Sequence, residues 1–219
     1  EYNNSIGALS LKFNTQGSRN VTIGNTSLYR NTTGSNNCAF GHASLYENKT
    51  GSNNVAIGRE ALRYNVNNNN TAVGFNSLQN NTNGNYNNSV GGFSLKYNTE
   101  GTRNIAMGYA SLYRNTSGSS NSAFGHASLY ENTTGNFNVA IGRDSLRNSV
   151  NNNNNVAIGY RSGLLIENGS DNITIGTSSN VSDSNATNQI VIGSGATGTG
   201  NNEIVFGNDS IIAIKSQVT

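Results

Sequence analysis

A pentapeptide of the form Asn-x-Ala-Ile-Gly recurs along the chain and limits strongly what the chain can fold into. It reads Asn-Val-Ala-Ile-Gly at residues 54–58, 138–142 and 155–159, and close variants lie between these copies. The final glycines, which we call the anchor glycines, are spaced by 17 residues, with one step of 16 and a last step of 14. They are Gly7, Gly24, Gly41, Gly58, Gly74, Gly91, Gly108, Gly125, Gly142, Gly159, Gly176, Gly193 and Gly207. A fixed period over the whole chain predicts a repeat protein in which each unit stacks on the next.

Other positions of the repeat are also constant. Leucine stands four residues after nine consecutive anchor glycines, from Leu11 to Leu146, and asparagine stands seven residues after eight of them. A second glycine follows ten residues after most anchors, as in Gly34, and Asn68 and Asn152 replace it in two copies. Because Gly and Asn best tolerate a left-handed backbone, we expect a turn with positive φ at this second glycine.

A longer period is superimposed on the short one. The segment 39–48 recurs without change as 123–132, which is 84 residues later. Five short repeats therefore make one super-repeat.

Seventeen residues are too few for a pair of helices but suit one coil with two short strands and two turns. We predict an all-β fold, a parallel β-roll or β-helix solenoid of about 13 coils with a 17-residue repeat. Coils about 4.8 Å apart would form a rod roughly 60 Å long. Residues 1–176 would hold the regular repeats, and residues 177–219 divergent terminal coils and a neck-like segment.

The apolar content decides how such a coil is expected to pack. Leu, Ile, Val and Phe make up 46 of 219 residues, yet the net charge is only +2 and proline is absent, so the chain is not of the disordered type. We expect the large residue before each anchor, such as Ile57, and the repeated leucine to lie inside the coil. The small residue one position earlier, such as Ala56, would then face an identical chain, and an assembly of several identical chains is expected.

Asparagine accounts for 44 residues, and one set of them begins each predicted strand. We expect these side chains to form an amide ladder along the rod. The set is Asn20, Asn37, Asn54, Asn70, Asn87, Asn104, Asn121, Asn138, Asn155 and Asn172.

Several classes of function find no support in the residues. No apolar run is long enough to span a membrane, and the 13 basic residues are scattered among 11 acidic ones, so neither membrane insertion nor nucleic-acid binding is expected. The carboxylates occupy equivalent slots of duplicated coils, as Glu47 and Glu131 do, and we predict no catalytic residue and no enzyme activity. No metal site or cofactor is predicted either, and Cys38, in a slot otherwise filled by valine, is expected to be a buried, inert thiol.

Aromatic and basic residues recur at the position five residues after the anchor glycine and at the position next to it. Stacked along a rod, they could bind sugar rings, or they could only shield the leucine row and keep the rod soluble. The candidate ligand-binding residues are Tyr29, Tyr46, Arg63, Tyr64, Tyr113, Tyr130 and Arg147.

The Asn-x-Ala-Ile-Gly strand resembles the head repeat of YadA-like trimeric autotransporter adhesins. The fuller pattern Gly-x-x-Ser-Leu-x-x-Asn-Thr-Thr-Gly resembles repeats of phage tail fibres and bacterial surface fibres that precede an endosialidase-type intramolecular chaperone. The stretches 188–193 and 203–219 are similar to the segment that commonly precedes that chaperone, which is itself absent. The resemblance implies a left-handed β-roll, a trimer and an extracellular position on a cell surface or a virion fibre.

These observations predict a non-enzymatic structural fibre segment, the shaft or head of a trimeric adhesin or tail fibre, that attaches to a cell surface. Its expected partners are copies of itself and a cell-surface glycan or protein receptor. Two alternatives stay open: a glycan-depolymerising tail spike, and an ice-binding solenoid, which would need a flat threonine ladder on a strand face.

Overall fold

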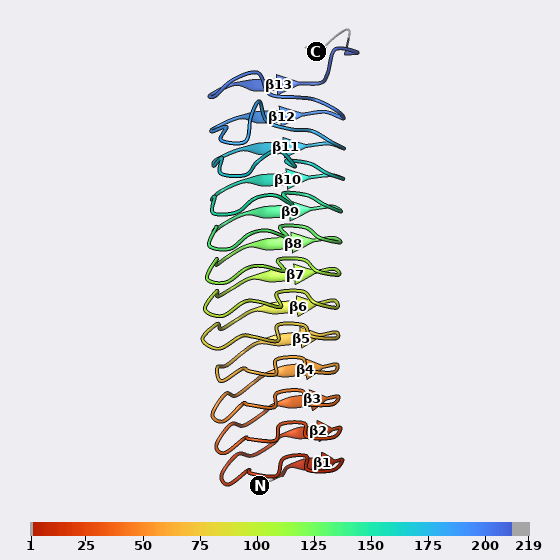
Figure 1. Cartoon of the computed structure of the whole chain (residues 1–219), viewed down its shortest axis with the longest axis vertical. Coiled ribbons are helices and arrows are strands. Elements are labelled where there is room, and N and C mark those ends of the chain that lie inside the picture. The colour runs from red at the N-terminus through yellow and green to blue at the C-terminus, as the bar shows by residue number, and fades with distance from the viewer. Residues whose placement is uncertain (1, 212–219) are drawn as a thin grey trace, which may run out of the picture.

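The protein is a straight rod of stacked coils (Figure 1). The structure is a computed structural model and describes residues 2–211. Each coil contributes one strand of three residues and two turns. The strands are β1 (Asn4–Ile6), β2 (Val21–Ile23), β3 (Cys38–Phe40), β4 (Val55–Ile57), β5 (Thr71–Val73), β6 (Asn88–Val90), β7 (Ile105–Met107), β8 (Ser122–Phe124), β9 (Val139–Ile141), β10 (Val156–Ile158), β11 (Ile173–Ile175), β12 (Ile190–Ile192) and β13 (Ile204–Phe206).

All thirteen strands form one parallel sheet, and their order in the sheet is their order in the chain. Equivalent residues of neighbouring coils pair directly, so Ala56 lies beside Ala39 and Ile57 beside Phe40. The 16-residue step between β4 and β5 keeps this register, with Val55 beside Thr71. The expected all-β parallel solenoid with a 17-residue repeat is therefore confirmed. Each coil has one strand, where the sequence suggested two.

The strand residues that are buried in the core are the opposite of those expected. From β2 to β12 the central residue of the strand is fully buried, as Ala39 and Ala106 are, whereas the larger residue that follows it is less buried: Ile23 is 46% and Met107 44% exposed. The repeated leucine is buried as expected, and together with the strand alanines it forms the core cluster. The leucine takes up the interior of each regular coil, and the buried side chain that the strand places beside it is small, alanine in most coils and serine or threonine in others.

The predicted positive φ at the second glycine of each coil is wrong, although a glycine is required there. A Cβ on Gly34 would lie 2.3 Å from the carbonyl oxygen of Gly51 in the next coil and 2.4 Å from Oδ1 of Asn31. In the 16-residue coil the corresponding carbonyl comes from Asn67, one position before Asn68. The size of the residue at this position is therefore limited by the close stacking of the turns of neighbouring coils. The anchor glycines up to Gly193 have the unusual backbone, with φ between +127° and +141°.

The buried leucines also have a left-handed backbone, with φ between 48° and 54° from Leu11 to Leu146. Such a conformation costs a residue with a side chain about 1–2 kcal/mol. It repeats in every regular coil because backbone hydrogen bonds to the coils on both sides fix the turn; Leu28 N–H, for example, donates to Ser44 O at 2.8 Å.

From β10 onward the coil interior changes while the sheet continues. The leucine slot holds Gly163, and Ile166 and Val181 become the large, fully buried side chains. The β12 and β13 strands still pair in register, Ile190 beside Ile204. Of the expected neck-like segment, residues 212–219 lie outside the described part of the chain.

Candidate functional site

The asparagines at the strand starts form a continuous buried ladder. Nδ2 of Asn104 donates to Oδ1 of Asn87 at 3.2 Å and to the carbonyl oxygen of Gly118 at 2.8 Å. Its Oδ1 accepts a hydrogen bond from the backbone N–H of Asn121 at 3.0 Å. The same bonds recur along the rod for the asparagines named above, and all are at most 1% exposed. Their role is structural: they tie each strand to the turn of the next coil.

A second amide ladder was not expected. The asparagine seven residues after the anchor donates to the matching oxygen of the preceding coil, as Nδ2 of Asn115 does to Oδ1 of Asn98 at 2.7 Å. This ladder runs from Asn14 to Asn132. The next coil has Ser149 at this position, and Oδ1 of Asn132 is buried without a hydrogen-bond partner among the described residues. The regular spacing of these asparagines was the signal that could have revealed it.

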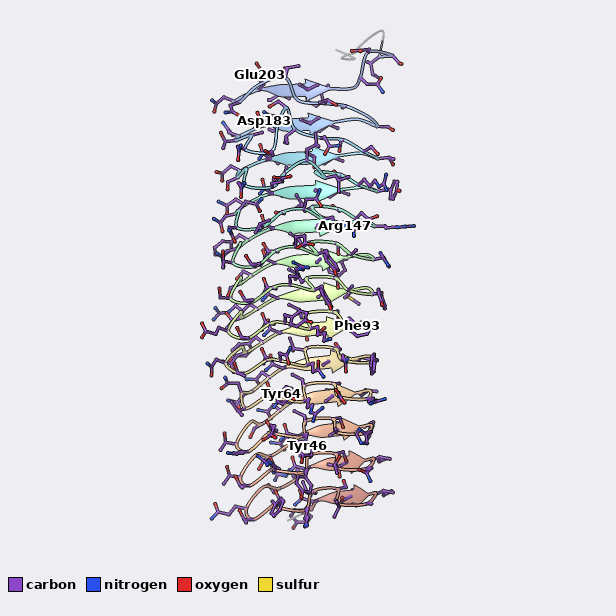
Figure 2. All side chains as sticks on the ribbon, viewed as in Figure 1. Tyr46, Tyr64, Phe93, Arg147, Asp183 and Glu203 are labelled. Atoms are coloured by element: carbon purple, nitrogen blue, oxygen red, sulfur yellow. The ribbon has the colours of Figure 1, made fainter. Side chains whose placement is uncertain are left out.

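All the candidate ligand-binding residues except Tyr64 belong to two aromatic clusters in the turns; Figure 2 labels Tyr46 of the first and Arg147 of the second. The first, which we call the N-terminal cluster, consists of Lys12, Phe13, Tyr29, Tyr46 and Arg63. Tyr29 and Tyr46 stack with ring centroids 5.0 Å apart, and Phe13 meets Tyr29 edge-on at 4.9 Å. Lys12 Nζ lies 5.3 Å from the ring of Phe13, and the guanidinium of Arg63 lies 5.7 Å from the ring of Tyr46. A cation therefore covers each end of a three-ring stack.

The second, the C-terminal cluster, repeats this arrangement with Lys96, Tyr97, Tyr113, Tyr130 and Arg147. Tyr113 and Tyr130 stack at 5.0 Å with planes 12° apart, and Tyr97 meets Tyr113 at 87°. Lys96 Nζ lies 5.2 Å from the ring of Tyr97, and Arg147 lies 5.5 Å from that of Tyr130.

The clusters differ from the predicted stripe in two ways. The predicted set omitted Phe13 and Tyr97, which stand one position after the aromatic slot and supply the ring that is turned away from the stack. Tyr64 belongs to neither stack; the guanidinium of Arg63 lies 5.2 Å from its ring.

Arginines beside the rings are neutralised by carboxylates of the next coil. Arg30 pairs with Glu47 at 3.0 Å, and Arg114 pairs with Glu131 at 3.2 Å. The acidic residues that the sequence offered as paired carboxylates thus hold arginines in place at the rim of the clusters.

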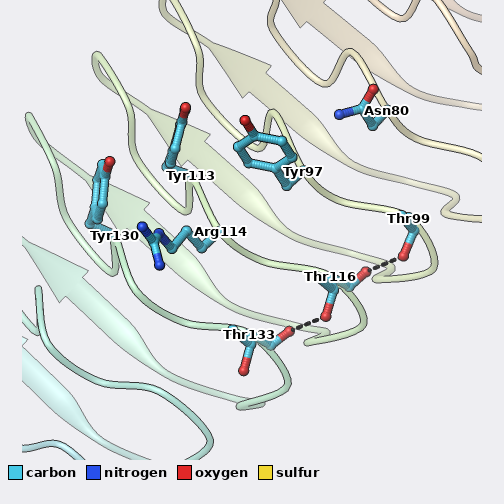
Figure 3. A pocket seen from close by; sticks show the side chains of 8 residues that line it. All are labelled: Asn80, Tyr97, Thr99, Tyr113, Arg114, Thr116, Tyr130 and Thr133. Carbon is cyan, nitrogen blue, oxygen red and sulfur yellow. Dashed lines mark hydrogen bonds between the residues drawn. The ribbon is translucent and has the colours of Figure 1, made fainter.

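An open groove lies over each cluster. The C-terminal groove has a volume of about 670 Å³, and Figure 3 shows Tyr113 and Tyr130 parallel along one side and Thr99, Thr116 and Thr133 along the other. The N-terminal groove of about 460 Å³ lies between Phe13, Tyr29 and Tyr46 on one side and Thr32 and Lys49 on the other. The threonines donate to backbone carbonyls of the next coil, Thr99 Oγ1 to Thr116 O at 3.1 Å, which fixes the far wall.

The two tyrosines that meet edge-on influence each other's ionisation. The hydrogen bond with Tyr97 and partial burial raise the pKa of Tyr113 to about 12. The same hydrogen bond and the ammonium group of Lys96 lower the pKa of Tyr97. Tyr113 therefore stays a neutral hydroxyl over the whole physiological range, and its oxygen can still accept a hydrogen bond from a ligand.

The outer face of the sheet is a second candidate surface, which we call the strand face. It consists of the first and third residue of every strand. None of these 26 positions, two in each of thirteen strands, carries a charge, and all but Asn4, Thr71, Asn88 and Ser122 are apolar. Cys38 lies on this face and is only partly buried, so the expected buried thiol is half exposed; burial raises its pKa.

The described residues contain no helix long and apolar enough to cross a membrane. Between residues 2 and 211, no three His, Cys, Asp or Glu side chains come together in a way that could hold a metal ion.

The fold and these surfaces define the class of protein: a parallel β-solenoid repeat protein with asparagine ladders. Comparisons with known protein families, with curated proteins and with solved structures find no match to this chain.

Proposed function

We propose that the protein is a non-enzymatic fibre segment, the shaft or head of a trimeric adhesin or tail fibre, that works outside the cell and attaches to glycans of a cell surface. The observation that carries the proposal is the strand face. Parallel sheets are almost always covered on both faces, because their strands are apolar on both. In one chain of this protein only the inner face is covered.

The strand face has the size of an interface. It runs over thirteen strands, which corresponds to a length of roughly 60 Å. Residues along its length are substantially exposed, among them Ile23 at 46%, Ile57 at 39% and Ile141 at 40%. A contiguous apolar surface of this length exceeds what monomers usually leave open to water. We propose that copies of the chain cover it by packing strand face to strand face around a common axis, in place of the contact through small residues that the sequence suggested.

The two aromatic clusters are the proposed points of attachment. No strand residue lines either groove. A chain that assembles through its strand face therefore leaves the groove residues outside the interface. Tyrosine rings with neighbouring arginine, lysine and threonine groups provide the apolar faces and hydrogen-bond donors that sugars need.

The assembly is tested by the mass of the particle in solution, measured by light scattering over a range of concentrations. A mass of three chains is expected. Ile57→Lys together with Ile141→Lys should convert it to a single chain, because each lysine would place a charge in an apolar interface. Asn25→Lys, at an exposed turn position, is the matched control and should leave the trimer unchanged. A monomer at high concentration for the unmodified chain would refute the assembly.

Attachment is tested by binding of the fluorescently labelled chain to whole bacterial and mammalian cells. Periodate oxidation of the cell-surface sugars should abolish binding to the cells that the chain recognises. Binding that survives oxidation would point to a protein receptor and contradict the glycan part of the proposal.

A further inference from the structure

The two grooves are copies of one another. Every residue that lines the N-terminal groove has its counterpart 84 residues later in the C-terminal groove. The pairs are Phe13 and Tyr97, Tyr29 and Tyr113, Arg30 and Arg114, Thr32 and Thr116, Tyr46 and Tyr130, and Lys49 and Thr133. Because stacked coils superpose their slots, the grooves lie on one side of the rod, five coils or about 24 Å apart.

Each groove contains one aromatic ring that is turned relative to the other two. Phe13 and Tyr97 lie at 86° and 87° to the stacked tyrosines, and they are 48% and 41% exposed. The stacked rings cover one another, whereas the turned ring offers more of its surface to a ligand. An exposed aromatic face next to fixed hydroxyl and guanidinium groups is suited to the apolar face of a sugar ring and its surrounding hydroxyls.

The grooves differ in charge. Lysine, arginine and glutamate recur at equivalent positions of both, Lys12, Arg30 and Glu47 in the first and Lys96, Arg114 and Glu131 in the second. The N-terminal groove has Lys49 where the C-terminal groove has Thr133, and the turn beside it has Gln16 where the other has Glu100. Each exchange makes the N-terminal groove more positive by one charge, hence by two in total. A carboxylate on a ligand would favour this groove.

We propose that the two grooves are subsites for a single linear polysaccharide that carries carboxylate groups and runs along the rod, with its acidic sugar in the N-terminal groove. This inference rests on the proposed attachment to glycans and adds the class of glycan and the way it is bound. Occupation of one groove holds the chain close to the second, so the affinity for a long chain rises far above that of either groove alone.

The experiment uses hyaluronan, a linear polysaccharide with alternating carboxylates, as the probe and the whole protein as the receptor. Titration calorimetry compares fragments that fill one groove with fragments longer than about 24 Å. The long fragments should bind on the order of 10²-fold more tightly than the short ones. Dextran, a neutral polymer, should bind the N-terminal groove more weakly than hyaluronan does.

Variants assign the effect to the grooves. Tyr29→Ala or Tyr113→Ala should reduce the affinity for long fragments to the level of short ones, and the double variant should abolish binding. Lys49→Thr gives the first groove the residue of the second and leaves every ring in place. It should lower the affinity for hyaluronan and leave the affinity for dextran unchanged. Tyr160→Ala is the matched control, because this exposed tyrosine also lies beside arginines but lines neither groove.

Three results would overturn the inference: no binding of hyaluronan, equal affinities for short and long fragments, or equal affinities for hyaluronan and dextran. The proposed function fails separately. If the double variant still binds cells in a periodate-sensitive way as a trimer, the grooves are not the subsites but the fibre function stands. If the unmodified chain is a monomer that binds hyaluronan through both grooves, the bivalent site stands and the fibre assembly falls.

Discussion

Replacement of Asn104 by alanine in the middle of the rod tests how much the amide ladder stabilises the fold. The side chain of Asn104 makes four hydrogen bonds: two to Asn121, one to Asn87 and one to Gly118. Gly118 O keeps a second donor, Nδ2 of Asn115 at 2.9 Å. The backbone N–H of Asn121 has no other acceptor in the structure's described part, so alanine would leave it buried and unpaired.

The magnitude follows from these contacts. An unpaired buried N–H costs about 1–3 kcal/mol, and each of the three other hydrogen bonds contributes about 0.5–1.5 kcal/mol. We therefore expect Asn104→Ala to lower the free energy of unfolding by roughly 5 kcal/mol. This is a large share of the about 5–15 kcal/mol that typically stabilises a folded chain.

Urea denaturation followed by circular dichroism measures the change, and hydrogen exchange locates it at the N–H of Asn121. Asn25→Ala is the matched control, since Asn25 is exposed, and it should change the free energy by less than about 0.5 kcal/mol. Equal stabilities of the two variants, with the N–H of Asn121 still protected, would refute the view that the ladder stabilises the rod.

Two further variants and one titration test the structure of the coil. Ser149→Asn combined with Asn152→Gly, which restores the asparagine and glycine pair of the regular coils, should stabilise the chain by about 1–3 kcal/mol, because the new amide would reach the unpaired Oδ1 of Asn132; unchanged denaturation midpoints would contradict this. Gly34→Ala should destabilise the chain far more than Ser35→Ala, because only at Gly34 would a Cβ meet backbone of the next coil at 2.3 Å; similar melting temperatures would refute the steric reason. The ring of Tyr113 should titrate near pH 12 in the NMR spectrum of the tyrosine-labelled chain, two units above the ordinary value of 10, and titration at 10 would show that its hydroxyl is free. Since this pKa is raised by folding, any stabilisation from the contact is present below pH 10 and is lost as the pH rises towards 12.

The sequence predicted the coil from its period, its leucines and its strand asparagines, and the structure has all three in the expected places. It failed at the choice of which strand face is buried. Alternation with a period of two separates Ala56 from Val55 and Ile57 but does not say which set is inside. Hydrophobicity favours isoleucine as the buried residue, whereas the limited width of the coil interior selects the smaller alanine. This width depends on how the turns close.

The turns were also read from their composition alone. Gly34 looked like a residue chosen for its φ, but the carbonyl of the next coil is what excludes a side chain there. No propensity would place Leu28 at a φ of 49°, because that conformation is unfavourable for leucine in isolation and arises only between stacked coils.

The aromatic slot predicted most of the two clusters, since residues in one slot of a solenoid must stack. Phe13 and Tyr97 occupy the following position, as Tyr64 does, and only the three-dimensional path of the turn shows that the first two lie against the stacked rings and Tyr64 does not. The 84-residue duplication is visible in the sequence, but only the lining residues show that it produces a pair of matching grooves.

The same duplication makes the length of the rod adjustable. Within residues 2–211 every strand contacts only the strands of the coils before and after it, and residues 39–48 are identical to residues 123–132. A deletion that joins Asn48 directly to Thr133 would therefore remove 84 residues and leave native neighbours on both sides of the junction. It would shorten the rod by about 24 Å, while both amide ladders and the strand face continue without interruption. Recombination between the two identical segments can thus give longer and shorter versions of the protein in steps of five coils, each with its own number of aromatic clusters.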